Sequence, residues 1–338
     1  MNQDRRNDLN RALRFMLAKS RCQGHTLQYF LGDEAGPTPA QALDDDVPSG
    51  DLIVNSSYRY ESRGETPLEI RERVRFTDSL LRGFPLAWIE DWGTGIWVPL
   101  WVRGEWVAVL ESLRPGEPAP SALTRREIQT LLSANVLVSA GAERTQRAAW
   151  DAIWSEAAVR FRTHGYAIVR RLIHPLLRGE LQHYYRALIA DARRSQDDDQ
   201  RAVRYRLHSE PAAMFLQPQI AGLVTRIAGE PVKPSYVYFT SYPAGDALSR
   251  HVDREQCEFS ISLLVDYVPN PVGTSGWPLF LEPPNLPDNV VAADLAIGDA
   301  VFYRGRQLVH YRDQLPAGHQ SSSVFLHYVR EDFVGEIV

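Results

Sequence analysis

The sequence SYVYFTSYPAGDALSRHVD, residues 235–253, is the most informative part of this chain. It begins as an alternating aromatic strand, with Tyr236 and Tyr238 on one face, and then breaks at a Pro-Ala-Gly turn. It ends on His251 and Asp253, which are two positions apart. Because residues two apart in a strand point to the same side, this imidazole and this carboxylate can bind one metal ion from one direction.

A third ligand must come from another part of the chain, and His310 is the candidate. Two histidines and one carboxylate on one side of a metal leave the opposite positions open, as in non-heme Fe(II) oxygenases. A His-x-Asp/Glu pattern alone is weak evidence, since nine His and 42 acidic residues in 338 give about one match by chance. A second match, His208 and Glu210, lies between a charged loop and a proline with no strand pattern around it. The context therefore favours His251.

The composition is typical of a globular protein, with 44% hydrophobic and 23% charged residues in 338, a length that fits about two domains. A net charge of −5 gives no basic footprint for nucleic acid. The two cysteines, Cys22 and Cys257, are far apart, which argues against a disulfide framework. No apolar run approaches the ~18 residues of a membrane span, and the N-terminus has no secretory signal, so a cytoplasmic protein is expected.

Residues in the N-terminal half alternate between helical and strand patterns. Apolar spacing predicts helices at 4–19, 67–81 and 123–146, with N-cap chemistry at 121–124, a strand at 25–31 and an exposed acidic loop at 36–50. The clearest local signal is residues 95–113, where two alternating runs flank Arg103-Gly104 and predict a β-hairpin. Five tryptophans lie around this hairpin, and core packing is their expected role.

This order of elements resembles a GAF domain, most clearly in GIWVPLWVRGEWVAVLESL followed by LTRREIQTLLSANVLVSAGAERTQ. The resemblance covers about residues 5–146 and implies an α/β domain at 1–146 that regulates, docks a substrate or mediates a homodimer. Residues 140–160 contain one glycine and no proline, so the two halves are expected to share a continuous helix.

The C-terminal half contains many short strands separated by turn signals, after helices at 173–192 and 216–229 and a polar loop at 193–206. Strands are predicted at 161–169, 259–267, 277–282, 290–296, 298–303 and 321–329. This pattern predicts a small antiparallel barrel or jelly roll, in which His251-Val252-Asp253 and His310 can converge at one mouth.

This half resembles the Fe(II)/2-oxoglutarate dioxygenases, in particular the prolyl hydroxylase-like branch. SYPAGDALSRHVD, GWPLFLEPPN and VHYRDQLPAGHQSSSVFLHYV carry the resemblance, over about residues 155–333. It implies an α+β chain whose second domain, 147–338, is a double-stranded β-helix (jelly roll) with flanking helices. It also implies Fe(II) on His251, Asp253 and His310, with 2-oxoglutarate as cosubstrate, ascorbate as an auxiliary reductant and O2 as oxidant. Related halogenases carry a small residue at the carboxylate position, so Asp253 indicates hydroxylation.

The distal carboxylate of 2-oxoglutarate usually pairs with an Arg or Lys on the strand after the second histidine, where this chain has His319. A histidine can take that role only when protonated. Arg312, two residues after His310, offers a permanent charge and is preferred here together with Tyr242. Ser321 or Ser323 could add a hydroxyl donor, and Arg304 and Arg306 are further options that are more typical of exposed turns.

The predicted function is hydroxylation of a C–H bond in a peptide, amino-acid or natural-product substrate, with succinate and CO2 as co-products. Two alternatives belong to other classes: a degenerate jelly roll that senses a ligand without turnover, and a cupin-type metal enzyme that uses no keto acid. The substrate pocket is the variable part of such folds, so the sequence does not identify the substrate.

Overall fold

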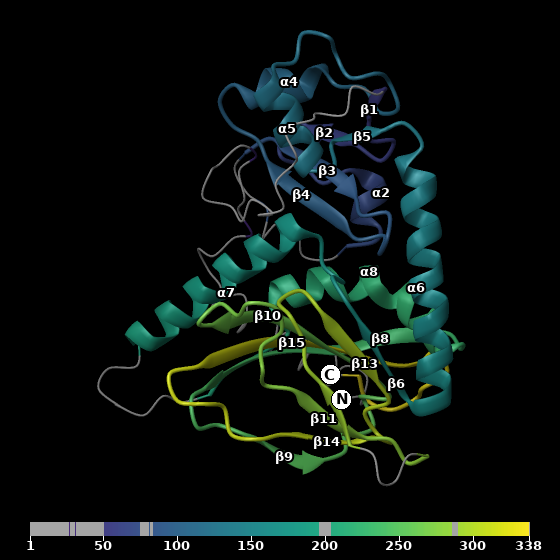
Figure 1. Cartoon of the computed structure of the whole chain (residues 1–338), viewed down its shortest axis with the longest axis vertical. Coiled ribbons are helices and arrows are strands. Elements are labelled where there is room, and N and C mark those ends of the chain that lie inside the picture. The colour runs from purple at the N-terminus through teal and green to yellow at the C-terminus, as the bar shows by residue number, and fades with distance from the viewer. Residues whose placement is uncertain are drawn as a thin grey trace, which may run out of the picture.

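The computed structural model describes residues 27, 31, 51–74, 81, 84–195, 204–285 and 290–337. The helix predicted at 4–19, the loop at 36–50 and most of the strand at 25–31 lie outside these residues. The chain is a mixed helix and sheet protein, with an N-terminal part stacked on a larger C-terminal part built from antiparallel strands (Figure 1). No helix in the described part combines the length and the apolarity needed to cross a membrane.

The larger sheet of the C-terminal part has six antiparallel strands in the order β6-β13-β10-β15-β8-β7. Their bounds are Tyr166–Val169 (β6), Tyr205–His208 (β7), Val232–Pro243 (β8), Phe259–Val268 (β10), Ala300–Tyr303 (β13) and Gln320–Arg330 (β15). The predicted strands agree in position, although the strand expected at 161–169 is shorter because the preceding helix continues to His164. The polar loop expected at 193–206 contains the beginning of β7.

A second sheet of four strands has the order β12-β11-β14-β9. Its strands are Leu248–His251 (β9), Leu279–Glu282 (β11), Val291–Ala293 (β12) and Val309–Arg312 (β14). Apart from the β11–β12 pair, the chain changes sheet at each successive strand from β8 to β15, as in a jelly roll. Leu264 and Tyr303 of the larger sheet pack in one cluster with Leu281 of the smaller one, so the two sheets stack face to face.

Alternation along the strands divides the larger sheet into two faces. On β10, Phe259, Ile261 and Leu263 join the main hydrophobic core, while Ser260 and Ser262 lie on the opposite, inner face. The helices α7 (Pro175–Ser195) and α8 (Pro211–Ala228) cover the outer face, between the sheet and the N-terminal part (Figure 1). Both helices were predicted, and α8 starts five residues earlier because buried Glu210 caps its N-terminus.

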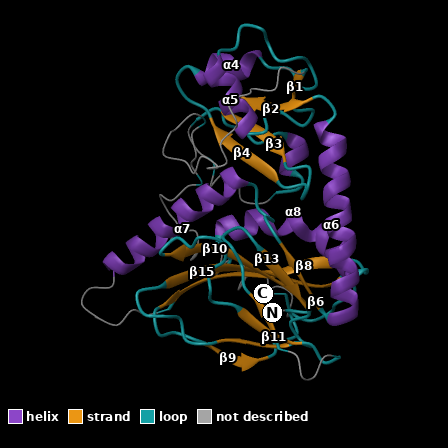
Figure 2. Cartoon of the chain, in the orientation of Figure 1, coloured by secondary structure: helices purple, strands orange, loops and turns teal. Residues whose placement is uncertain are grey.

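The N-terminal part combines small sheets with short helices (Figure 2). Its strands are Leu52–Val54 (β1), Arg59–Glu61 (β2), Leu86–Glu90 (β3), Trp97–Trp101 (β4) and Leu137–Ser139 (β5), and its helices are Leu68–Arg71 (α2), Trp106–Ser112 (α4) and Arg125–Ser133 (α5). The helix predicted at 67–81 is therefore one turn within the described residues. The five tryptophans of this part are at most 6% exposed, which agrees with core packing.

The hairpin predicted at 95–113 is wrong in its second strand. β4 pairs with β3, whereas the residues after Gly104 form the helix α4. Trp106 and Leu110 are buried and lie four positions apart, while Ala108 between them is exposed. Apolar residues at 106, 108 and 110 fit the two-residue repeat of a strand, and those at 106 and 110 also fit one face of a helix. Packing against the core selects the helix.

The long helix predicted at 123–146 is also wrong. Thr124 caps α5 through a capping box with Glu127, but the helix ends before Asn135, whose φ of 56° is left-handed. The chain then pairs β5 with β1 and starts a new helix, α6 (Ala142–His164), after Gly141. The shared helix between the halves is confirmed as α6.

The GAF-like resemblance depended on the hairpin and the long helix, and neither forms, so that assignment is not confirmed. The division of the chain at 146/147 stays a prediction, and α6 runs across it. The two parts are in direct contact. The Trp97 backbone N–H donates to Gln219 Oε1 at 2.8 Å, and the Trp154 indole donates to the Gly93 carbonyl at 2.7 Å.

Candidate metal centre

The smaller sheet places two imidazoles side by side. His251 ends β9 and His310 lies on β14, and the two residues are direct partners across these antiparallel strands. Their ring centroids are 4.3 Å apart. His310 is buried together with Arg312, while Val309 and Tyr311 of the same strand are only partly buried, so the alternation of β14 turns His310 and Arg312 inward.

Asp253 completes the group from the loop after β9. Its backbone N–H donates to the Gly305 carbonyl at 2.8 Å, which fixes the loop against the turn before β14. Its Oδ1 lies 3.6 Å from His251 Nε2 and 3.5 Å from His310 Nε2. The structure therefore brings together the three residues that the sequence suggested as ligands, with their donor atoms all within 4.8 Å of one another.

Backbone carbonyls set the tautomers of both histidines. His251 Nδ1 lies 2.8 Å from the Ser249 carbonyl, and His310 Nδ1 lies 3.0 Å from the Leu308 carbonyl. A carbonyl only accepts, so each Nδ1 carries the proton and each Nε2 lone pair is free to bind a metal. Two lone pairs and a carboxylate oxygen thus face one point, which requires a cation there.

The charge balance of the metal-free group agrees with this requirement. Burial would raise the pKa of Asp253, but His251 and His310 outweigh it and hold that pKa well below its usual range. The interaction with Asp253 raises the pKa of His251. In the absence of a metal, a proton on His251 can therefore take the place of the cation.

The second carboxylate oxygen of Asp253 is held by the larger sheet. Ser260 Oγ donates to Asp253 Oδ2 at 3.1 Å and lies 3.0 Å from His327 Nδ1. Ser260 on β10 and His327 on β15 are register partners. Burial lowers the pKa of His327 to about 4, so this imidazole is neutral at pH 7. The pair orients Asp253 so that Oδ1 alone faces the histidines.

Gly305 is a part of the site that the sequence reasoning missed. A Cβ at this position would lie 2.4 Å from Asp253 Oδ2, 2.5 Å from the Cys257 carbonyl and 2.7 Å from Ser260 Oγ. The carboxylate is therefore packed directly against the Gly305 backbone. The only available signal was a glycine in the turn five positions before His310.

A second group of candidate ligands, Asp253, Cys257 and His327, lies on the other side of the carboxylate. The Cys257 thiol lies 3.0 Å from the Tyr236 hydroxyl, and burial raises the pKa of this thiol to about 12. The thiolate is the form that binds metals, so a neutral thiol is a poor ligand. The histidine pair with Asp253 Oδ1 is the stronger metal site.

Arg312 is a buried cation without a counter-ion within the described residues. It is 4% exposed, and Nη1 donates to the Trp277 carbonyl at 2.7 Å, while the guanidinium carbon lies 4.6 Å from the Trp277 ring centroid. Its Nε and Nη2 have no hydrogen-bond partner among these residues. Burial lowers the pKa of Arg312, yet a guanidinium remains charged in proteins.

Hydroxyl groups without partners lie on the inner face of the larger sheet. The register pairs Ser323 with Thr240 and Ser321 with Tyr242, which places these side chains on one face of the sheet. Thr240, Ser262, Ser321 and Ser323 are buried and their hydroxyls make no hydrogen bond with the described residues. Unsatisfied buried donors are rare in native proteins, so this interior is suited to a polar ligand.

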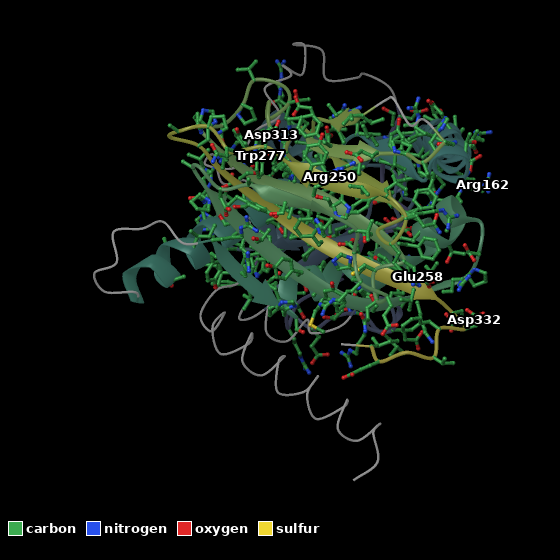
Figure 3. The ribbon with its side chains drawn as sticks, turned by 90° about the horizontal axis from the view of Figure 1, so that it is seen from below. Arg162, Arg250, Glu258, Trp277, Asp313 and Asp332 are labelled. Atoms are coloured by element: carbon green, nitrogen blue, oxygen red, sulfur yellow. The ribbon has the colours of Figure 1, made fainter. Side chains whose placement is uncertain are left out.

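The other candidate cosubstrate residues are placed differently. Tyr242 is buried and packs edge-on against Trp277, with the two ring centroids 5.1 Å apart. Trp277 in turn donates to the Asp313 carbonyl at 2.8 Å, and both lie at one end of the roll (Figure 3). His319 is half-buried before β15 and pairs with the Tyr267 hydroxyl at 2.9 Å.

Arg304, Arg306 and His208 contact other groups. The Arg304 guanidinium packs over the Phe161 ring, and its Nη1 lies 3.8 Å from Glu230 Oε1. Arg306 Nη1 lies 3.8 Å from Glu258 Oε1. His208 was expected outside any strand but ends β7, where it is exposed and packs on Tyr238 with ring centroids 4.6 Å apart. Of the arginines considered from the sequence, Arg312 alone is buried with unused donors.

Comparison with solved structures found similar folds for about half of the chain. The α-ketoglutarate-dependent epimerase SnoN from nogalamycin biosynthesis has 19% sequence identity and a TM-score of 0.40, over 53% of this chain and 84% of that one. EctD from S. alaskensis has 16% identity and a TM-score of 0.42, over 52% of this chain and 76% of that one. A Pseudomonas putida prolyl-4-hydroxylase has 18% identity and a TM-score of 0.36, over 53% and 99%. No protein-family model and no curated protein matches the sequence.

Proposed function

We propose that this chain is an Fe(II)- and 2-oxoglutarate-dependent oxygenase that hydroxylates a C–H bond of a peptide, amino-acid or natural-product substrate. The observation that carries the proposal is the convergence of His251 Nε2, His310 Nε2 and Asp253 Oδ1 on one point. Three ligands from one side leave the remaining positions of an octahedral metal open, and this ligand set selects Fe(II) in oxygenases.

The residues around this point fit a keto acid. Arg312 lies two positions after His310 on the same strand, so the two α-carbons are about 6.6 Å apart and both side chains face inward. A five-carbon dicarboxylate bound to the metal at one end can therefore reach the guanidinium with the other. Thr240, Ser321 and Ser323 supply hydroxyl donors along the same interior. When bound, iron and 2-oxoglutarate activate O2 for substrate hydroxylation, with release of succinate and CO2.

The chain's own residues keep this site selective and dry. Asp253 would supply a carboxylate to the metal where related halogenases have a small residue that admits halide, which favours hydroxylation. Trp277 packs on Arg312, and Tyr242 packs on Trp277. Arg312 is 4% exposed, so little water reaches its charge. A buried cation without a partner is costly, so binding of an anion at Arg312 recovers part of that cost.

The test is turnover of the purified protein with Fe(II), 2-oxoglutarate and O2, measured as succinate formed. Asp253→Ala should abolish iron binding and turnover, while Asp332→Ala, at a side chain that is 85% exposed, should retain both. Wild-type iron affinity in Asp253→Ala would reject the assigned site. Failure of the metal-loaded protein to bind 2-oxoglutarate would favour a ligand-sensing scaffold, and turnover without the keto acid would favour a cupin-type enzyme.

The role of the N-terminal part in regulation, docking or dimerisation stays a prediction. A cavity of about 480 Å³ beside the start of α6 favours the binding of a small molecule. Its lining includes the apolar side chains of Ile53, Trp92 and Val138 and the cationic side chain of Arg144.

A further inference from the structure

Arg254 follows the metal ligand Asp253 directly and is held in place by one aromatic residue. Its Nε donates to the Tyr236 hydroxyl at 3.2 Å, and its guanidinium carbon lies 4.6 Å from the Tyr236 ring centroid. The Tyr236 hydroxyl is itself 3.0 Å from the Cys257 thiol. The Nε side of the Arg254 guanidinium is therefore held by Tyr236, and Tyr236 is itself held by Cys257.

The outer edge of the same guanidinium is available to a ligand. Arg254 is exposed and forms no ion pair with any of the described residues. Burial acts to lower the pKa of Arg254, and the Tyr236 hydroxyl and the Cys257 thiol raise it. The two Nη groups form a fork that matches a carboxylate, and a prefixed fork loses little side-chain entropy on binding.

A row of aromatic rings extends from the metal centre to the edge of the larger sheet. His327, which contacts Ser260 beside Asp253, lies 4.5 Å from Tyr236 and 6.3 Å from Phe325 between ring centroids. Phe325 then lies 6.0 Å from Tyr238, and Tyr238 lies 4.6 Å from His208 on the edge strand β7. Flat apolar groups stack favourably on such rings.

A second cation lies at the far end of this row. Arg206 on β7 is the register partner of Thr240, which puts it on the same face as Tyr238, and it is exposed without an ion pair to a described residue. Burial raises the pKa of Tyr238, and the positive charge of Arg206 acts to lower it, so this charge acts on the row of rings. The rings are therefore flanked by arginines at both ends.

We infer that the substrate of the proposed oxygenase is an anion with a flat or cyclic body, whose carboxylate binds the outer edge of Arg254. That the bound anion is a substrate rests on the proposed function. The anion site itself rests only on Arg254, Tyr236 and the row of rings. Arg312 does not compete for this role, since it lies beyond the histidines on β14 and is buried. Arg254 is the specificity residue, and Tyr236 is a positioning residue that acts through it.

The test compares two probes that have the same flat body and differ by one charge, trans-cinnamate and cinnamamide. Calorimetry on the full chain, loaded anaerobically with Fe(II) and 2-oxoglutarate, measures their affinities without turnover. Cinnamate should bind about tenfold more tightly than the amide, as expected for one charge-assisted hydrogen-bonded pair. Arg254→Gln should remove this preference, Arg254→Lys should keep part of it, and Tyr236→Phe should weaken it while the ring remains. Arg226→Gln, an exposed arginine on α8, should keep it in full.

Equal affinities in the wild type, no binding of cinnamate at millimolar concentration, or an acid preference that survives in Arg254→Gln would each overturn the inference. The titrations and the succinate assay together separate the two proposals. An acid preference in a protein that consumes no 2-oxoglutarate would leave this inference standing and reject the proposed function. Turnover without an acid preference would do the reverse.

Discussion

Gly305→Ala is the sharpest perturbation that the structure offers, because it adds one methyl group beside the metal centre. The new Cβ would lie 2.4 Å from Asp253 Oδ2, where ordinary contacts begin at 3.4 Å, so the carboxylate would have to move by about 1 Å. The Cys257 carbonyl at 2.5 Å is backbone and cannot rotate away. The displacement must therefore be absorbed largely by Asp253 and Ser260.

The expected consequence is a large loss of metal affinity with a smaller loss of stability. Carboxylate oxygens bind divalent metals at about 2.0–2.2 Å with a tolerance of about 0.2 Å, so a shift of about 1 Å breaks the bond. Disturbing even an outer partner of a ligand costs roughly 10- to 100-fold in affinity, which is a lower bound here. The added methyl group should lower the free energy of unfolding by about 1–3 kcal/mol. Anaerobic titration with Fe(II), followed by calorimetry, and urea denaturation measure the two quantities.

Gly222→Ala is the matched control, since a Cβ at this position on α8 would contact nothing within 4 Å. It should leave the iron affinity unchanged and raise the stability by up to about 1 kcal/mol, because alanine favours a helix. Wild-type iron affinity in a folded Gly305→Ala protein would refute the argument that Asp253 is positioned by contact with this backbone.

Three further changes test other parts of the structure. Arg312→Gln should weaken 2-oxoglutarate binding by roughly 10- to 100-fold, measured by calorimetry, with iron affinity unchanged; unchanged keto acid affinity would exclude Arg312 as its anchor. Burial lowers the pKa of His174, so acidification below about pH 6.5 protonates the unfolded chain first and reduces the free energy of unfolding. In urea denaturation at about pH 7 and pH 5, His174→Gln should lose less stability than the wild type, and an equal loss would contradict this. Thr124→Ala should lower the unfolding free energy by about 1 kcal/mol through loss of the capping box, whereas Thr124→Ser should not.

The strands of the C-terminal part were predictable because their signals are local. β8 and β10 alternate over ten or more residues, and turn residues separate the shorter strands. The shift from strand to helix after Gly104 was not predictable in this way, since Trp106 and Leu110 satisfy both periods. The apolar pattern predicted that the helix would continue past Asn135, but the chain there turns to pair β5 with β1. This pairing is a long-range contact, which a local pattern does not show.

The same distinction holds within the site. His251 and Asp253 are neighbours in sequence, and His310 was found through the order of the strands around it. Ser260 and Gly305 were missed because a serine on a strand and a glycine in a turn are common, and their importance comes from a carboxylate brought there by the fold. Arg312 and His319 could be told apart only by burial, which follows from the alternation of β14.

The helix α6 has a consequence for how the two parts can be studied. At 1.5 Å per residue its 23 residues span about 35 Å, along the side of both parts (Figure 1). Near its middle, Trp154 donates to Gly93 in the N-terminal part and packs on Phe302 of β13 with ring centroids 6.4 Å apart. A chain shortened to begin at residue 147 would lose the first turn of this helix. It would also lose Gly93, against which Trp150 and Trp154 both lie, so part of each indole would become exposed. Separate expression of the C-terminal half should therefore yield an aggregation-prone product unless those tryptophans are replaced.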